Sequence, residues 1–235
     1  TFLVFFQKIF FYNFANLIIS NSQGSRDTIR KFIINKKKVI YIYNPYLKKI
    51  FKENTKYRKN IILFVGRFVE QKGIKYLLDA FSMFEKKKRN FELWMVGSGP
   101  EIKRIKDFKS EKNLKNKIKL FNWQNDLSKF YKNAKYFVLP SIYEGLGNVV
   151  IEALNYSRIC IVSNCKHGPS EILNYGKGGF IFQSKSSIDL YRKLMKIDEN
   201  YDKAKKKVEF GRTGLNRFLI NKQSLKYLIA LKNLK

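Results

Sequence analysis

Short apolar runs alternate with longer segments of helical spacing along the chain after residue 59. The runs are rich in β-branched and aromatic residues, which is typical of strands covered on both faces of a parallel sheet. They lie at Ile61–Val65, Phe91–Val96, Ile118–Phe121, Tyr136–Leu139, Ile159–Val162 and Phe180–Phe182. The helical segments between them are Ile74–Phe84, Glu101–Glu111, Leu127–Asn133, Asn148–Tyr156 and Ser170–Asn174. This alternation predicts an α/β fold with a doubly wound, Rossmann-like parallel sheet.

The first 58 residues carry a separate pattern. Leu17–Ser20 and Val39–Tyr43 are predicted as strands, with a helix near Gln23–Ile33 between them. Because two strands cannot bury their faces without neighbours, we expect residues 1–50 to be the end of another, truncated α/β domain. The chain also opens on Thr1 in the middle of an apolar, helix-like pattern, which favours the same interpretation.

Changes in composition give the remaining boundaries. Residues 51–58 are polar and have the composition of a linker, so residues 59–197 should form the sheet domain. Residues 198–235 are predicted as basic C-terminal helices with a charged face at Lys205–Lys207. Their apolar face is predicted at Leu225, Leu228, Ile229 and Leu231.

Composition excludes disorder as the general state, because 45% of the residues are hydrophobic and 16% are aromatic. The 48 Lys and Arg residues against 18 Asp and Glu give a formal net charge of +30. Such a charge favours anionic partners, namely nucleic acid, an acidic membrane surface or phosphorylated small molecules. The abundance of Lys, Asn, Ile, Phe and Tyr is also typical of AT-rich coding sequences, so the charge alone names no partner.

The chain offers little for metal binding or membrane insertion. Cys160 and Cys165 lie five positions apart with only His167 nearby, so no zinc site is completed and we expect buried, reduced thiols. No Asp-X-Asp sequence occurs, and we expect neither a metal nor another cofactor. No uninterrupted apolar run reaches the ~20 residues of a membrane-spanning helix.

Ligands bind at the carboxyl ends of the strands in a doubly wound sheet, and the glycines of this chain gather there. The most specific loop begins at Pro140, and its glycines and the following helix start suit a closely approaching polar or anionic group. Glu144 and Glu152 should face one crevice and accept hydrogen bonds from hydroxyl groups, unless Glu144 only caps the helix and Glu152 is merely exposed. The candidate binding residues here are Glu144, Gly145, Leu146, Gly147, Asn148 and Glu152.

Two other strand ends carry turns of the same kind. Gly66 and Arg67 follow the first strand, and Lys72 stands near the start of the next helix. Arg67 and Lys72 are placed to converge on a diphosphate, the first as a planar fork and the second as a point charge. Gly97 lies in the turn after the second strand, which lacks the third glycine and the acidic residue of the dinucleotide fingerprint.

Taken together, these segments resemble the donor domain of a GT-B glycosyltransferase of the retaining family 4, also called group 1. The pair Glu144 and Glu152 matches the family's EX7E motif, and Leu17–Pro45 resembles the close of its N-terminal domain. The other matching segments are Phe64–Arg67, Lys72-Gly73, Val96–Pro100 and Pro140-Ser141. The resemblance implies a GT-B fold with a complete C-terminal half and a truncated N-terminal half.

The resemblance also implies roles for single residues. In the family, the residues at the positions of Arg67 and Lys72 hold the donor diphosphate. The first glutamate, here Glu144, contacts the transferred sugar, and the second, here Glu152, hydrogen-bonds the ribose. The catalytic candidates are therefore Arg67, Lys72 and Glu144, without a covalent nucleophile. The segment Asn164–Ile172 resembles a loop of enzymes that build bacterial lipopolysaccharide, capsule or lipid-linked glycans.

The expected function is transfer of a sugar from a nucleotide-sugar, by this resemblance a UDP-sugar, to a glycan or lipid-linked acceptor with retention. We expect a cytoplasmic protein attached peripherally to the anionic inner face of the membrane. One alternative is a donor-binding fragment that is inactive alone, because the family's N-terminal half supplies most of the acceptor site. The other is a basic nucleic-acid-binding protein, although no helix-turn-helix, RNP or zinc-finger pattern appears and no specific nucleic acid is expected.

Two side chains keep open roles at this stage. Trp123 stands either near the nucleotide base or in an ordinary core or surface position. His167 either reaches a donor phosphate or has a structural role in its loop.

Overall fold

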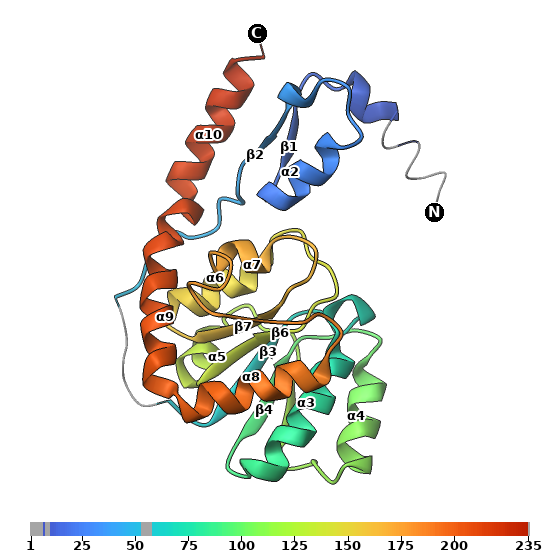
Figure 1. Cartoon of the computed structure of the whole chain (residues 1–235), viewed down its shortest axis with the longest axis vertical. Coiled ribbons are helices and arrows are strands. Elements are labelled where there is room, and N and C mark those ends of the chain that lie inside the picture. Colours follow the sequence, from blue (N-terminus) through green and yellow to red (C-terminus); the bar gives the residue numbers. More distant parts are fainter. Residues whose placement is uncertain (1–6, 8–9, 53–57, 235) are drawn as a thin grey trace. The chain divides into compact units, whose positions relative to one another are not determined.

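The computed structural model describes residues 7, 10–52 and 58–234 (Figure 1). The chain contacts divide it into two compact units, of which the larger is Phe51–Leu215. The smaller unit combines Thr1–Ile50 with Asn216–Lys235. The C-terminal helices, which the sequence grouped as one segment, are therefore shared between the two units.

The larger unit contains a six-stranded sheet in which every neighbouring pair is parallel. Its order is β5-β4-β3-β6-β7-β8, and Ile62 of β3 pairs with Leu93 on one side and Tyr136 on the other. The strands are β3 (Ile61–Val65), β4 (Glu92–Val96), β5 (Ile118–Phe121), β6 (Tyr136–Leu139), β7 (Ile159–Ser163) and β8 (Phe180–Phe182). This topology confirms the predicted doubly wound, Rossmann-like sheet.

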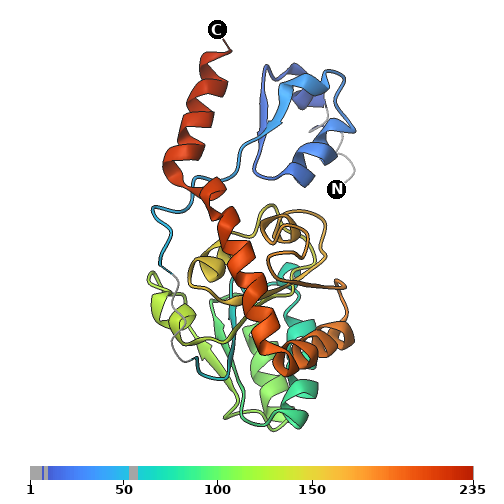
Figure 2. The same cartoon turned by 60° about the vertical axis from the view of Figure 1, so that its left-hand side comes forward.

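Helices cover both faces of this sheet, as right-handed crossovers require (Figure 1). Helices α3 and α8 pack side by side, and both views show them together (Figure 2). Helices α6 and α9 pack against each other and against β7. The helices of this unit are α3 (Ile74–Lys87), α4 (Ile102–Glu111), α5 (Ser128–Asn133), α6 (Asn148–Asn155), α7 (Pro169–Ile172), α8 (Ser187–Glu199) and α9 (Tyr201–Thr213).

Several boundaries differ from the predicted ones for local reasons. Strand β4 begins at Glu92, because the Phe91 amide closes the turn after α3 by donating to the Lys88 carbonyl. Helix α8 has no counterpart among the predicted segments. Its start is fixed by Ser186, whose side chain caps the helix by accepting a hydrogen bond from the Asp189 amide.

The core of the larger unit lies between the sheet and its helices. Strands β3, β6 and β7 are buried at every position, which explains why they are continuously apolar in the sequence. On α3 the buried residues recur with helical spacing, among them Leu77, Phe81 and Phe84. Burying one such side chain contributes about 2 kcal/mol, so this core holds the strand ends in fixed register.

The smaller unit is built around the two-stranded parallel sheet of β1 (Ile18–Ser20) and β2 (Val39–Tyr41), connected through α2 (Gln23–Arg30). Helix α2 ends before the predicted Ile33, because the Lys31 and Phe32 amides turn back to the carbonyls of Thr28 and Ile29. Helix α10 (Ile220–Lys232) belongs to this unit, and the Tyr43 ring lies 5.0 Å from that of Phe218.

The first residue of the segment predicted as a linker, Phe51, is bound to the larger unit. The Phe51 amide donates to Asn155 Oδ1 at 2.9 Å, and its carbonyl accepts from Arg212 Nη2 at 2.7 Å. Its ring lies 4.9 Å from that of Tyr156. Residues 53–57 of the predicted linker lie outside the described residues.

A polar cluster around the carboxylate of Asp198 ties α8 to the sheet. Asp198, with a side chain only 10% exposed, accepts hydrogen bonds from Lys135 Nζ and the Tyr136 hydroxyl, each at 2.7 Å. Lys88 Nζ, at the end of α3, lies 3.2 Å from its other oxygen. Burial opposes ionisation of Asp198, but the hydrogen bonds from Lys135 and Tyr136 outweigh it and lower the pKa of the carboxyl.

We predict that Asp198→Asn lowers the free energy of unfolding by about 2 kcal/mol at pH 7, because two lysines lose their counter-charge. Because the pKa of Asp198 is lower in the folded protein, its ionised form stabilises the fold at pH values above the ordinary pKa of the carboxyl. This stabilisation is lost as the pH falls through the folded-state pKa. The difference in the free energy of unfolding between wild type and variant should therefore shrink in acid. Urea unfolding at pH 7 and pH 3 measures it, with Asp107→Asn on exposed α4 as the control. Equal effects of the two substitutions would contradict the cluster's role.

Candidate functional site

The order of the strands reverses between β3 and β6, which are neighbours at the middle of the sheet. The chain leaves β3 toward β4 and β5 on one side, and it leaves β6 toward β7 and β8 on the other. Ligands of open α/β sheets bind outside the carboxyl ends of the strands at such a switch point. The predicted residues Arg67 and Lys72 follow β3, and Glu144 follows β6.

A partly buried ion pair joins these two strand ends. Lys72 Nζ lies 2.5 Å from Glu144 Oε1, and the two side chains are 14% and 9% exposed. Charges so far removed from water attract strongly, but each also costs free energy to desolvate, so the pair needs further hydrogen bonds. The structure thus brings together two of the three predicted catalytic residues.

Two serines extend this pair toward β7. Ser141, which is fully buried, donates from Oγ to Glu144 Oε1 at 2.7 Å. Ser163, at the end of β7, donates from Oγ to the Ser141 carbonyl oxygen. The carboxylate of Glu144 is therefore held directly by Lys72 and Ser141, and Ser163 supports the backbone of Ser141 from the end of β7.

Arg67 is exposed, so its guanidinium is available to a ligand. Its Nη2 donates to Gln71 Oε1 at 3.4 Å. Gln71 also bridges the loops that follow β3 and β6. Its side-chain Nε2 donates to the Tyr143 carbonyl at 2.9 Å, and its backbone carbonyl accepts from the Ile142 amide at 2.8 Å. Gln71 was not among the predicted site residues, and no sequence pattern marks it.

Two glycines let these loops approach closely. A Cβ atom at Gly73, where φ is +63°, would lie 2.1 Å from the Pro140 carbonyl oxygen. A Cβ atom at Gly97 would lie 2.0 Å from the Gly66 carbonyl oxygen. Real side chains do not fit at such distances, so the turns after β3, β4 and β6 can meet only with glycine at both positions.

Helix α6 starts directly beyond the ion pair. Its N-cap is Gly147, with φ of +88°, and Asn148 is its first residue. Gly145 is exposed and Leu146 is buried, packed against the loop of Gly168. The helix dipole and the amides of the first turn suit an anionic group at this place.

Glu152 sits on the second turn of α6 and is half-buried. Four residues of helix place it about 6 Å further along the axis than Asn148. The structure therefore keeps the two glutamates at different depths, with Glu144 in the ion pair and Glu152 beyond the helix start. Glu144 also accepts hydrogen bonds from Lys72 and Ser141, so capping the helix is not its only contact.

The two cysteines are free and buried, as predicted. Burial raises the pKa of the Cys160 thiol and of the Cys165 thiol, so both stay protonated near neutral pH. Cys165 Sγ lies 3.7 Å from the His167 carbonyl oxygen, which fits a structural role for this loop. Within the described residues, no three His, Cys, Asp or Glu side chains are grouped so that they could hold a metal ion.

Trp123 and His167 occupy loops at the same edge of the sheet. Trp123 is 57% exposed in the connection after β5, which excludes the core position considered for it. His167 has a φ of +102° directly before Gly168. The roles of Trp123 and His167 in ligand binding stay predictions.

The model of the family described as "Glycosyl transferases group 1" matches residues 47–214. The chain belongs to this family. Every predicted site residue, from Gly66 to Glu152, falls inside the matched region. The switch-point site of this group 1 chain therefore lies within the region that the family model matches.

Relatives and solved structures support the assignment. An uncharacterized glycosyltransferase of Methanocaldococcus jannaschii is 32% identical over 181 residues, 70% of this chain and 43% of that protein. A Campylobacter jejuni protein named N-acetylgalactosamine-N,N'-diacetylbacillosaminyl-diphospho-undecaprenol 4-alpha-N-acetylgalactosaminyltransferase is 27% identical over 224 residues, 92% of this chain and 60% of that protein. The group 1 chain thus spans about half the length of these relatives.

The fold matches that of GT-B glycosyltransferases. A glycosyltransferase from Rickettsia africae superposes with a TM-score of 0.83 at 23% identity, covering 96% of this chain and 66% of that one. Anabaena HepE in complex with UDP superposes with a TM-score of 0.83 at 18% identity, covering 93% of this chain and 64% of that one. At these identities the likeness concerns the fold alone.

We predict that Gly73→Ala lowers the free energy of unfolding by at least about 2 kcal/mol, because its methyl group collides with the Pro140 carbonyl in a left-handed backbone conformation. Gly176→Ala is the matched control. Its φ is also positive, at +93°, but a Cβ atom there would lie 3.6 Å from Ile181. Only the backbone strain remains in the control, about 1 kcal/mol. Chemical denaturation compares the two, and equal losses would contradict the close approach.

Proposed function

We propose that this chain provides the donor side of a retaining, family 4 glycosyltransferase that acts in bacterial-type lipopolysaccharide or surface polysaccharide synthesis. Its donor is a nucleotide-sugar, specifically a UDP-sugar with a hexosyl or N-acetylhexosaminyl group. Its acceptor is a glycan or a lipid-linked glycan. The observation that carries the proposal is the Lys72–Glu144 pair at the switch point, with the exposed Arg67 beside it.

The ion pair gives Lys72 a defined position without a donor. A diphosphate arriving at the carboxyl ends of β3 and β6 competes with Glu144 for the lysine, while Arg67 offers a planar fork to the same oxygens. Glu144 keeps its hydrogen bond from Ser141 and is then free to accept one from a sugar hydroxyl. Donor binding would thus exchange one existing interaction, with hydrogen bonds from Ser141 and a sugar hydroxyl replacing the lysine at Glu144.

Bond cleavage places negative charge on the leaving diphosphate. Arg67, Lys72 and the amides that begin α6 at Asn148 are the groups that would stabilise this charge. Losing one preorganised contact of this kind costs roughly 3 kcal/mol of transition-state stabilisation. The proposal needs no metal, because cationic side chains take its place, and it assigns no covalent nucleophile.

Binding and turnover need different parts of the molecule. Transfer requires the acceptor hydroxyl close to the anomeric carbon and the exclusion of water. The chain matches only 43% and 60% of the length of two relatives, so a second candidate function is donor binding without transfer by this chain alone.

We also propose that the protein works at the anionic cytoplasmic surface of a membrane. The net charge of +30 supports this, since each Lys or Arg near such a surface contributes up to about 1 kcal/mol. The Campylobacter jejuni relative is named for a diphospho-undecaprenol acceptor. The helices that the structure describes include none with the length and apolar character of a membrane span.

We predict that the chain binds UDP more tightly than ADP or GDP without added metal. Glu152→Ala should weaken UDP binding about tenfold by removing a hydrogen-bonded carboxylate, whereas Glu144→Ala should change nucleotide affinity little and mainly lower transfer. Glu111→Ala, at the exposed end of α4, is the control. Isothermal titration calorimetry measures the affinities on folded protein. Equal or absent binding of all three nucleotides would refute the proposed donor.

A further inference from the structure

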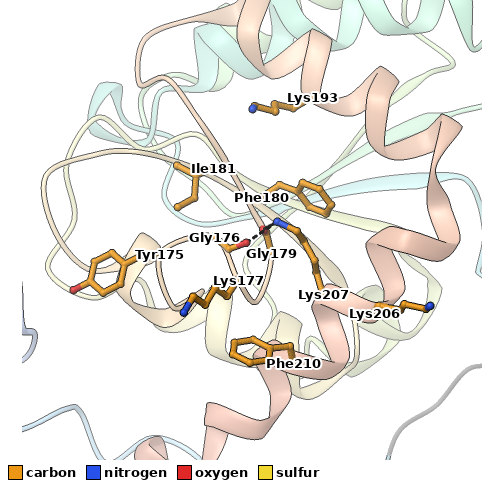
Figure 3. Close-up of a pocket in the computed structure, with 10 residues that line it drawn as sticks. All are labelled: Tyr175, Gly176, Lys177, Gly179, Phe180, Ile181, Lys193, Lys206, Lys207 and Phe210. Carbon is orange, nitrogen blue, oxygen red and sulfur yellow. Dashed lines mark hydrogen bonds between the residues drawn. The ribbon is translucent and has the colours of Figure 1, made fainter.

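A pocket lies at the edge of the six-stranded sheet, beside edge strand β8 and away from the central switch point (Figure 3). It has a volume of about 760 Å³ and is formed by the loop between α7 and β8 together with α8 and α9. Four lysines line it, namely Lys177, Lys193, Lys206 and Lys207. The residues that line it include no Asp or Glu.

Lys207 fixes the shape of this pocket. Its Nζ donates to the Gly176 carbonyl at 2.7 Å and to the Gly179 carbonyl at 3.4 Å. Figure 3 shows these two bonds at the centre of the pocket, between Lys193 and Lys177. A contact between two glycines holds helix α9 against the same loop, because a Cβ atom at Gly178 would lie 2.5 Å from Gly211 Cα. Lys207 of α9 is therefore bound to the loop by hydrogen bonds and is not a free surface side chain.

The pocket concentrates positive charge at this place. Burial lowers the pKa of Lys207, and the charge of Lys193 lowers it further. A cation held beside another cation, with no acidic side chain in the lining, gains from a bound anion. Lysine ammonium groups bind phosphate oxygens as point charges and suit a phosphate group that enters from solvent.

High net charge alone does not explain the arrangement. A pocket beside α4 also contains basic residues, Lys103 and Arg104, but its lining includes the acidic residues Asp107 and Glu111. The lining of the pocket beside β8 has no acidic residue and includes three aromatic residues. Lys207 Nζ lies 4.9 Å from the centre of the Phe180 ring, and Phe210 is 45% exposed at the rim.

The loop is also strained where it meets solvent. Asn174 and Tyr175 have φ values of +48° and +52°, and Tyr175 is 66% exposed. Left-handed conformations are costly for a bulky aromatic residue and persist where the surrounding structure fixes them. The loop thus presents an aromatic ring to solvent at the rim of a basic pocket.

We propose that this pocket binds the phosphate group of a ligand whose neighbouring part is apolar, at a site separate from the donor site. The ammonium groups of Lys177, Lys193 and Lys207 surround the phosphate. The rings of Tyr175, Phe180 and Phe210 contact the apolar part. The phosphate comes either from a soluble compound or from the headgroup of an anionic lipid, and the two sources are distinguished by experiment.

The first arm uses inorganic diphosphate and the whole chain labelled with ¹⁵N. Titration should shift the amide signals of Gly176 and Gly179, while those of Gly66 and Gly97 report separately on the donor site. The double variant Lys177→Ala/Lys193→Ala should weaken binding at the pocket at least about tenfold. The control Lys106→Ala/Lys115→Ala removes the same charge from exposed positions on and after α4 and should bind as wild type does.

The second arm uses sedimentation with vesicles of phosphatidylcholine, with and without phosphatidylglycerol. Loss of vesicle binding in the pocket variant but not in the control, without a diphosphate shift, supports a lipid source. A pocket-specific diphosphate shift supports a soluble source. The proposal is overturned if diphosphate leaves Gly176 and Gly179 unchanged and the two double variants bind vesicles equally. If the amide signals of Gly66 and Gly97 do not shift, this result bears on the proposed donor site and not on the pocket beside β8.

Discussion

The partly buried ion pair between Lys72 and Glu144 connects the two loops that the proposed chemistry uses. Its two side chains come from the segments that follow β3 and β6, which are adjacent in the sheet but lead the chain in opposite directions. A pair at such a place fixes the separation of the two loops between which a ligand of this fold binds. The glycine contact of Gly73 with Pro140 and the hydrogen bonds of Gln71 depend on the same separation.

Much of the fold follows from the sequence, because strands that are buried on both faces must be continuously apolar. All six strands of the sheet were located from their apolar runs, and β3, β5, β6 and β8 have the predicted bounds. Helix α8 was missed, since only the short signal from Ser186 to Asp189 marks its start. The division of α9 and α10 between two units depends on packing partners distant in sequence, which periodicity does not reveal.

The site was predictable in its residue types but not in its connections. The segments that follow the apolar runs contain the glycines, Arg67, Lys72 and Glu144. Parallel strands bring such segments to one edge of the sheet. Local patterns do not encode which side chains then pair, because Lys72 and Glu144 are 72 positions apart. Ser141, noted only as part of the segment Pro140-Ser141, and Gln71 were given no site role for the same reason, since common polar residues gain their roles only from what the fold places beside them.

A double-mutant cycle on Lys72→Met and Glu144→Gln tests most directly whether the two loops are joined as described. The measured quantity is the free energy of unfolding of the wild type, both single variants and the double variant in urea. Residues in one buried pair should show a coupling of about 1 to 3 kcal/mol, so the double variant should lose less stability than the sum of the single losses. Additivity to within about 0.5 kcal/mol would mean that the pair does not hold the strand ends together, and it would contradict the account.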